Sequence, residues 1–330
     1  MQAEVSKFWK SDAGTLVMYF IGVVVLAAIL MPWMYQLGMW LARLAEAGEV
    51  SGVLKSIGKS AAGAAEKGKI GRFFTRSMTL AALLLMPLLL WRLRRGRNDG
   101  GLGLAGLPTT SRKLLHLGFG VTLSGGILWL SALGLAAAGA FSVKEGFRPG
   151  ELLAGALLPA VGAAIGEEWL FRGLLLGAWL RVQSTWRAII GSSVLFAVLH
   201  FMSPLPGQKV VDPGAALAGF ELLGKIFLRF AEPRFFVAEL LTLFILGMLL
   251  AWARVRTKSL WLPIGLHLGI VFAFKAFNMG HARLVDGPVS PWWVGMDLRA
   301  GVVPLASLLV MALILKGFLA WDKKRSNFKE

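Results

Sequence analysis

The chain has 330 residues, of which 56% are hydrophobic and 16% are charged, and its formal net charge is +17. So much apolar surface exceeds what a soluble domain of this length buries, which predicts a membrane protein with several spanning helices. The absence of cysteine excludes disulfides, Cys-ligated zinc, iron–sulfur clusters and a thiol nucleophile. The Lys and Arg residues gather in loops between apolar stretches, a distribution typical of topology signals and contact with anionic lipid, and not of nucleic-acid binding.

Apolar stretches of about spanning length recur along the whole chain. They predict an all-α bundle of about eight transmembrane helices, at residues 15–33, 75–91, 118–142, 152–180, 186–202, 235–253, 259–277 and 302–320. Basic loops at 181–187 and 254–258 alternate with charge-balanced loops at 143–151 and 278–301. With the basic tail, this alternation predicts that both termini are cytoplasmic.

The N-terminal third is predicted to be a membrane appendage, residues 1–114, ahead of a core at 115–320 and a basic cytoplasmic tail at 321–330. Its segment 43–76 places Lys at helical spacing among small and apolar residues, which predicts either an interfacial amphipathic helix or a flexible Gly/Ala/Lys linker. This basic segment falls on the outer side of the predicted topology, contrary to the usual charge rule. Residues 93–113 have the composition of a glycine-rich basic loop.

Two adjacent carboxylates, Glu167 and Glu168, interrupt the apolar stretch 152–180, and Arg172 follows one helical turn later. An acidic side chain at bilayer depth costs about 2.5–3.5 kcal/mol on insertion scales, so it is normally kept there for a function. Glu168 and Arg172 stand at positions i and i+4, which predicts a structural ion pair. Glu167 points about 100° away around the helix and is left as the candidate general base.

The same stretch carries a stripe of small residues along one helix face. Its members recur at intervals of one or two turns: Gly162, Gly166, Gly173 and Gly177. Small residues in this pattern let the backbones of two membrane helices approach closely. Another helix is therefore expected to pack against this face.

Two of the four histidines, His200 and His267, lie inside apolar stretches. Counted from the basic loops at about 1.5 Å per residue, Glu167, His200 and His267 reach comparable depths on three different helices. Helix bundles build polar sites from inward-facing side chains, so the three residues are expected to form one site. Each histidine taken alone is equally consistent with a structural hydrogen bond between helices.

Six residues in these stretches, taken in chain order, resemble the motif set of a known family of membrane proteins. They are Glu167, Glu168, Arg172, Phe196, His200 and His267. The family is the CPBP family, which groups the type II CAAX prenyl endopeptidases with bacteriocin-processing and Abi-type membrane proteins. The resemblance covers about residues 150–280 and implies an α-helical bundle.

The resemblance implies intramembrane proteolysis without a covalent intermediate. Glu167 and His200 would activate a water for attack on a peptide carbonyl, and His267 would stabilise the oxyanion. Supporting roles would fall to Glu168, Arg172 and Phe196. No cofactor is implied, although a zinc ion held by Glu167, His200 and His267 is a second choice. The implied partners are membrane lipid and a membrane-associated peptide or protein, prenylated or carrying a leader.

The chain departs from the family pattern at Val271, where many members have an Asn one turn after the third-motif histidine. Loss of one oxyanion donor costs about 10²–10³ in rate in other enzymes, so a weaker site is expected. Two other classes of function stay open: a carrier with a Glu/His proton relay, and a non-catalytic scaffold that binds a partner protein. The carrier is less favoured because the sequence has no inverted halves and no second acidic cluster in the core.

Overall fold

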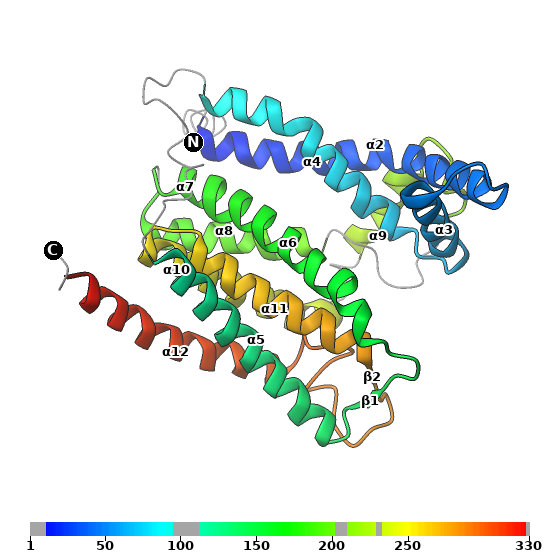
Figure 1. The fold of residues 1–330 in the computed structure, drawn as a ribbon. Helices are drawn as coiled ribbons and strands as arrows, with labels where there is room; N and C mark the ends of the chain where they lie inside the picture. Colours follow the sequence, from blue (N-terminus) through cyan, green and yellow to red (C-terminus); the bar gives the residue numbers. More distant parts are fainter. Residues whose placement is uncertain (1–10, 95–111, 182, 202–209, 229–232, 328–330) are drawn as a thin grey trace. The chain divides into compact units, whose positions relative to one another are not determined.

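The computed structural model describes residues 11–94, 112–181, 183–201, 210–228 and 233–327 (Figure 1). The chain divides into two compact units, the first made of residues 1–101 and 198–236 and the second of residues 102–197 and 237–330. The all-α class is confirmed. In the described ranges, the one sheet is an antiparallel pair of three-residue strands, β1 (Phe141–Val143) with β2 (His281–Arg283).

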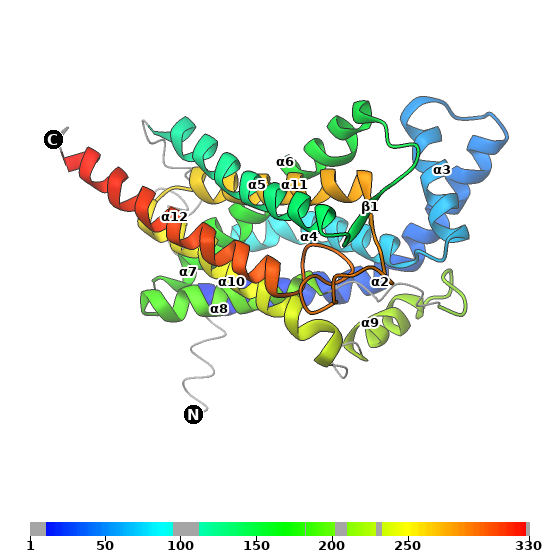
Figure 2. The same cartoon turned by 90° about the horizontal axis from the view of Figure 1, so that it is seen from below.

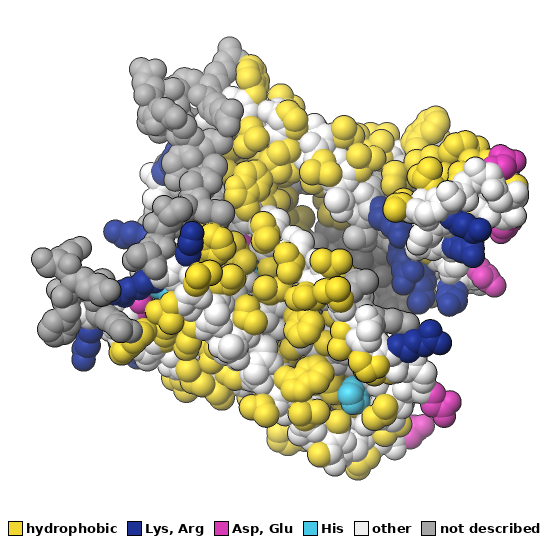
Figure 3. Space-filling model, in the orientation of Figure 1, with side chains coloured by type: hydrophobic (Ala, Val, Ile, Leu, Met, Phe, Trp, Pro, Cys, Tyr) yellow, Lys and Arg dark blue, Asp and Glu magenta, His cyan; other side chains and the backbone are white. Residues whose placement is uncertain are grey.

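Six helices in the described part of the chain are long and apolar enough to span a membrane. They are α2 (Asp12–Glu46), α4 (Gly71–Arg94), α5 (Lys113–Ala137), α10 (Pro233–Thr257), α11 (Trp261–Gly280) and α12 (Val302–Asn327). A seventh apolar helix, α8 (Thr185–His200), is shorter. The protein is thus an integral membrane protein, and Figure 3 shows hydrophobic side chains over much of the visible surface of its helices.

The predicted span at 152–180 is a helical run of several pieces and not a single α-helix. The run consists of η1 (Pro149–Glu151), η2 (Leu153–Leu157), α6 (Leu158–Glu168), η3 (Trp169–Leu175) and α7 (Leu176–Trp179). Both η2 and η3 are π turns. Such turns are rare, lie mostly inside α-helices and are frequent at functional sites.

Three other predicted boundaries differ from the structure. Helix α2 continues to Glu46, well past the expected end, and α12 continues through most of the predicted tail. Helix α5 ends five residues early, since Gly139 adopts a φ of 80° and turns the chain into β1. A residue with a side chain rarely adopts this conformation, which explains why the helix stops there.

The first unit contains α3 (Gly52–Glu66), so the segment 43–76 is mostly helical and the flexible linker is not observed. The buried face of α3 consists of Gly58, Ala61 and Ala64. A Cβ atom at Gly58 would lie 2.5 Å from the carbonyl oxygen of Leu41 in α2. Small residues therefore let α3 rest on the α2 backbone, and Figure 3 shows Lys and Arg side chains gathered beside it. Most of the predicted loop 93–113 lies outside the described residues.

Helix α9 (Ala218–Leu228) packs on α2 in the first unit through another glycine. Pro32 lies inside α2 and has no N–H to donate to the carbonyl of Ala28, four residues earlier. Gly219 faces that same carbonyl so closely that a Cβ atom would collide with its oxygen. The proline and the glycine together explain why α9 contacts α2 at this point.

The second unit is built around the pair α5 and α11, which run side by side in Figures 1 and 2. Gly120 of α5 touches the α11 backbone, since a Cβ atom there would lie 2.6 Å from the amide nitrogen of Leu266. Gly265 and Gly269 of α11 abut the α5 backbone in return. The β1–β2 pair joins the ends of the same two helices. This contact fixes the rotation of α11, which carries His267.

Candidate active site

The two glutamates lie at the end of α6, directly before the π turn η3. Arg172 is inside that turn, and its side chain is 2% exposed. An inserted π turn shifts the following side chains around the helix axis relative to a regular α-helix. Arg172 therefore projects from a local irregularity in the helix, which begins directly after the two glutamates.

Glu168 is fully buried, and its Oε1 atom contacts two basic side chains, those of Arg172 and His267. Arg172 Nη1 donates to Glu168 Oε1 at 2.9 Å, so the predicted ion pair is present. His267 Nδ1 lies 2.7 Å from that oxygen. Arg172 Nη2 also donates to the carbonyl oxygen of Gly247 in α10 at 3.2 Å. Glu168 and Arg172 thus tie α6, η3, α10 and α11 together.

Phe196 of α8 covers this ion pair. The guanidinium carbon of Arg172 lies 4.2 Å from the centroid of the Phe196 ring, a distance at which the ring face attracts a cation. The ring also meets His267 edge to face at 6.2 Å between centroids. Gly247 makes room for it, since a Cβ atom there would lie 3.3 Å from Phe196 Cδ1. Phe196 therefore holds Arg172 and His267 in place and keeps water from their contact with Glu168.

Glu167 differs from its neighbour in being partly exposed, although its Oε2 atom is buried. Its side chain is 35% exposed, whereas that of His267 is 3% exposed, and its Oε2 lies 3.9 Å from His267 Nε2. This distance is too long for a direct hydrogen bond, and contacts of this length are commonly bridged by a water molecule. The imidazole of His267 thus presents one nitrogen to the buried Glu168 and the other to the Oε2 atom of Glu167, which is itself buried although the side chain as a whole is partly exposed.

The orientation of His267 determines its chemistry. With Nδ1–H donating to Glu168, Nε2 of the neutral ring is an acceptor toward Glu167, and Nε2 of the imidazolium is a donor. The arrangement can therefore accept a proton at Glu167 and donate a hydrogen bond from His267.

Two of the three predicted catalytic residues, Glu167 and His267, approach each other in this cluster. His200 is the last residue of α8, has an exposed side chain and belongs to the first unit, whereas the cluster around Glu168 lies in the second. The joint action of His200 and Glu167 stays a prediction. Val271 lies one turn beyond His267, is half-buried and has no polar side-chain atom. Among the described residues, no group of three His, Asp or Glu side chains is arranged to hold a metal ion.

Sequence reasoning missed two features of the cluster. The contact of His267 with Glu168 was not predicted, because the hydropathy pattern does not show how α11 is rotated about its own axis. The role of Gly247 was missed as well, because a glycine inside an apolar stretch has no signal that its carbonyl receives an arginine.

Residues 149–273 match the family model described as type II CAAX prenyl endopeptidase Rce1-like. The matched segment contains all six residues of the motif set, together with Gly247 and Val271. No curated protein and no solved structure gives a significant match to the chain.

Proposed function

Since its Rce1-like segment makes this chain a member of the CPBP family, we propose that it is an intramembrane endopeptidase of the CAAX type. The observation that carries the proposal is the position of the partly exposed Glu167, whose Oε2 lies 3.9 Å from the Nε2 atom of a buried His267 held by Glu168. An accessible carboxylate is a competent general base. A fixed imidazole is a competent donor to developing negative charge.

In the proposed reaction, Glu167 takes a proton from a water molecule as the water oxygen bonds to the carbonyl carbon of the scissile peptide. His200 assists this activation, as the family resemblance implies. The carbonyl oxygen becomes an oxyanion that accepts a hydrogen bond from His267 Nε2–H. The carbon–nitrogen bond then breaks, and Glu167 returns its proton to the leaving nitrogen. Glu168, Arg172 and Phe196 act as positioning residues for His267.

The proposal extends to the setting of the reaction. The substrate is a membrane-associated peptide or protein, prenylated or carrying a leader, and the enzyme lies in a prokaryotic plasma membrane with both termini in the cytoplasm. The reaction uses no cofactor. The zinc alternative assigns Glu167, His200 and His267 as ligands and predicts that a chelator such as 1,10-phenanthroline abolishes cleavage by the purified protein.

The decisive experiment compares the peptide ends present in membranes of cells that express the intact protein or Glu167→Gln at equal level. Glu46→Gln is the matched control, since Glu46 is exposed at the end of α2 and outside the site. Peptide ends that vanish with Glu167→Gln and persist with Glu46→Gln would support the protease and identify its substrate. Identical ends in all three strains would overturn it.

The second candidate is a non-catalytic scaffold of the same fold. It is favoured by Val271, which has no hydrogen-bond donor where many family members have an Asn. On this alternative the buried cluster holds the bundle together, and Glu167→Gln leaves binding of the partner protein intact. Capture of the same partner by both proteins, without any loss of peptide ends, would select the scaffold.

A further inference from the structure

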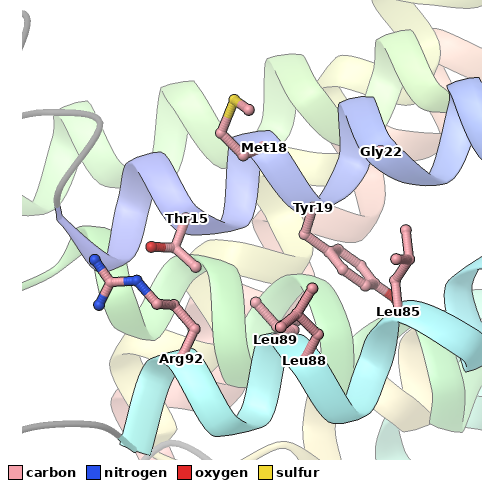
Figure 4. Close-up of a pocket in the computed structure, with 8 residues that line it drawn as sticks. All are labelled: Thr15, Met18, Tyr19, Gly22, Leu85, Leu88, Leu89 and Arg92. Atoms are coloured by element: carbon pink, nitrogen blue, oxygen red, sulfur yellow. The ribbon is translucent and has the colours of Figure 1, made fainter.

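A groove of about 400 Å³ lies between α2 and α4 in the first unit, outside the segment that matches the family model. Figure 4 shows the side chains that line it. Its walls are mostly apolar, formed by Met18, Tyr19 and Gly22 of α2 and by Leu85, Leu88 and Leu89 of α4. Thr15 and Arg92 lie together at one end of the groove (Figure 4). The groove therefore has an apolar length and a single cationic end.

Two residues of α2 create the space. Gly22 has no side chain to fill it, and a Cβ atom there would already lie 3.3 Å from Leu85 Cδ1. The hydroxyl of Tyr19 donates a hydrogen bond to the carbonyl oxygen of Ala82 in α4 at 2.9 Å. This bond fixes the Tyr19 ring between the two helices, where it forms one wall of the groove.

The groove opens toward the lipid. Leu88 and Met18 on its rim are 59% and 53% exposed, and both helices are candidate spans. A half-exposed Trp91 stands beside Arg92. Tryptophan is enriched where hydrocarbon meets headgroups, so the cationic end lies at headgroup level.

The dimensions and charge fit one kind of ligand. Leu85 and Arg92 are separated by seven residues, or about 10 Å along α4 at about 1.5 Å per residue. The apolar walls are long enough to contact part of an acyl chain, and the guanidinium at the end of the groove can bind the phosphate of the same lipid. The sequence after Arg92 is also rich in arginine, which favours an anionic leaflet at this end of α4.

We propose that the groove between α2 and α4 binds an anionic phospholipid, with one acyl chain along Tyr19, Gly22 and Leu85 and the phosphate at Arg92. Lipid bound there fills the space that Gly22, having no side chain, leaves open beside α4. The groove is thus a lipid site of the N-terminal region, and its occupancy does not depend on the proposed protease activity.

The test measures the lipid that remains on the full-length protein after purification in mild detergent, by native mass spectrometry. Delipidated protein is then loaded with phosphatidylglycerol or phosphatidylcholine as defined probes. Arg92→Gln removes the cationic end, and Gly22→Phe fills the groove. Arg76→Gln is the matched control, because it removes the same charge from an exposed position near the other end of α4. Gly126→Phe is the second control, since a Cβ atom at Gly126 of α5 meets nothing within 4 Å.

We expect Arg92→Gln to weaken retention of phosphatidylglycerol about fivefold, the effect of one arginine at an anionic surface, and Gly22→Phe to abolish it. Both controls should retain lipid as the intact protein does, and phosphatidylcholine should be retained less than phosphatidylglycerol. Equal retention by Arg92→Gln and Arg76→Gln, or equal retention of the two lipids, would overturn the proposal. Displacement of the lipid by a prenylated peptide would also overturn it and would assign the groove to the substrate. If Gly22→Phe unfolds, the comparison of the two arginine variants decides the question.

Discussion

Adjacent glutamates in this chain have opposite environments, and their roles follow from that difference. Glu168 is completely buried and bound by Arg172 and His267, whereas about a third of the Glu167 side chain is accessible. A buried carboxylate needs compensating charge, so Glu168 suits the task of holding other groups. An accessible carboxylate beside an oriented imidazole suits proton transfer.

Replacement of Arg172 by Met should destabilise the protein strongly, because it leaves the buried Glu168 with His267 as its remaining cationic partner. Breaking a buried ion pair on one side costs about 3–5 kcal/mol. The free energy of unfolding in detergent, measured with a denaturant series, gives the effect. Arg76→Met serves as the control, since Arg76 is exposed. A loss below about 1 kcal/mol, the typical effect for a surface pair, would contradict the structural role of Arg172.

Replacement of Val271 by Asn should raise the rate of cleavage. The amide would add a hydrogen-bond donor one turn beyond His267, and one such donor is worth about 10²–10³ in rate in other enzymes. The measurement is kcat for a substrate found by comparison of peptide ends. Val271→Leu keeps the position apolar and should leave kcat nearly unchanged. Equal rates for Val271→Asn and Val271→Leu would show that the oxyanion is stabilised without this position.

At the scale of helices, the glycine pattern of one helix does not predict which neighbouring helix packs closely against it. The stripe on the 152–180 run predicted a close neighbour: no described atom of its own unit lies within 4 Å of a Cβ atom built at Gly162 or Gly166, whereas Gly173 of the same stripe is buried. Close backbone contacts in the second unit instead lie between α5 and α11, at Gly120, Gly265 and Gly269. Spacing along one helix predicts a smooth face, but not which helix packs against it.

Replacement of Gly120 by Ala should therefore separate α5 from α11. The added methyl group would meet the backbone of Gly265 and Leu266, and forced overpacking typically costs about 1–3 kcal/mol. Gly126→Ala in the same helix is the control, since its methyl group meets nothing and alanine favours a helix by up to about 1 kcal/mol. Thermal unfolding of both variants measures the difference. Equal midpoints would show that α5 can shift without cost.

At the scale of the whole molecule, the absence of cysteine makes the topology directly measurable. A single cysteine at each exposed position Ser184 and Ser290 can be probed with a maleimide that does not cross membranes. The charge pattern predicts that Ser290→Cys reacts in intact cells and that Ser184→Cys reacts only after permeabilisation. The reverse result would place the termini outside.

Ser56→Cys on α3 tests on which side of the membrane the basic segment 43–76 lies. Labelling of this cysteine in intact cells would confirm that the segment is on the outer side.

The sequence alone was sufficient for the all-α membrane class, most of the spans and the Glu168–Arg172 pair. These properties are local, because a span is set by the length of its apolar stretch and an i,i+4 pair by helix geometry. The orientation of His267 between two glutamates, the carbonyl of Gly247 and the Phe196 ring depended on tertiary structure. Lipid and protein interior are equally apolar, so hydropathy does not encode how a spanning helix is rotated. Only close contacts such as those of α5 with α11 decide which nitrogen of His267 faces which carboxylate.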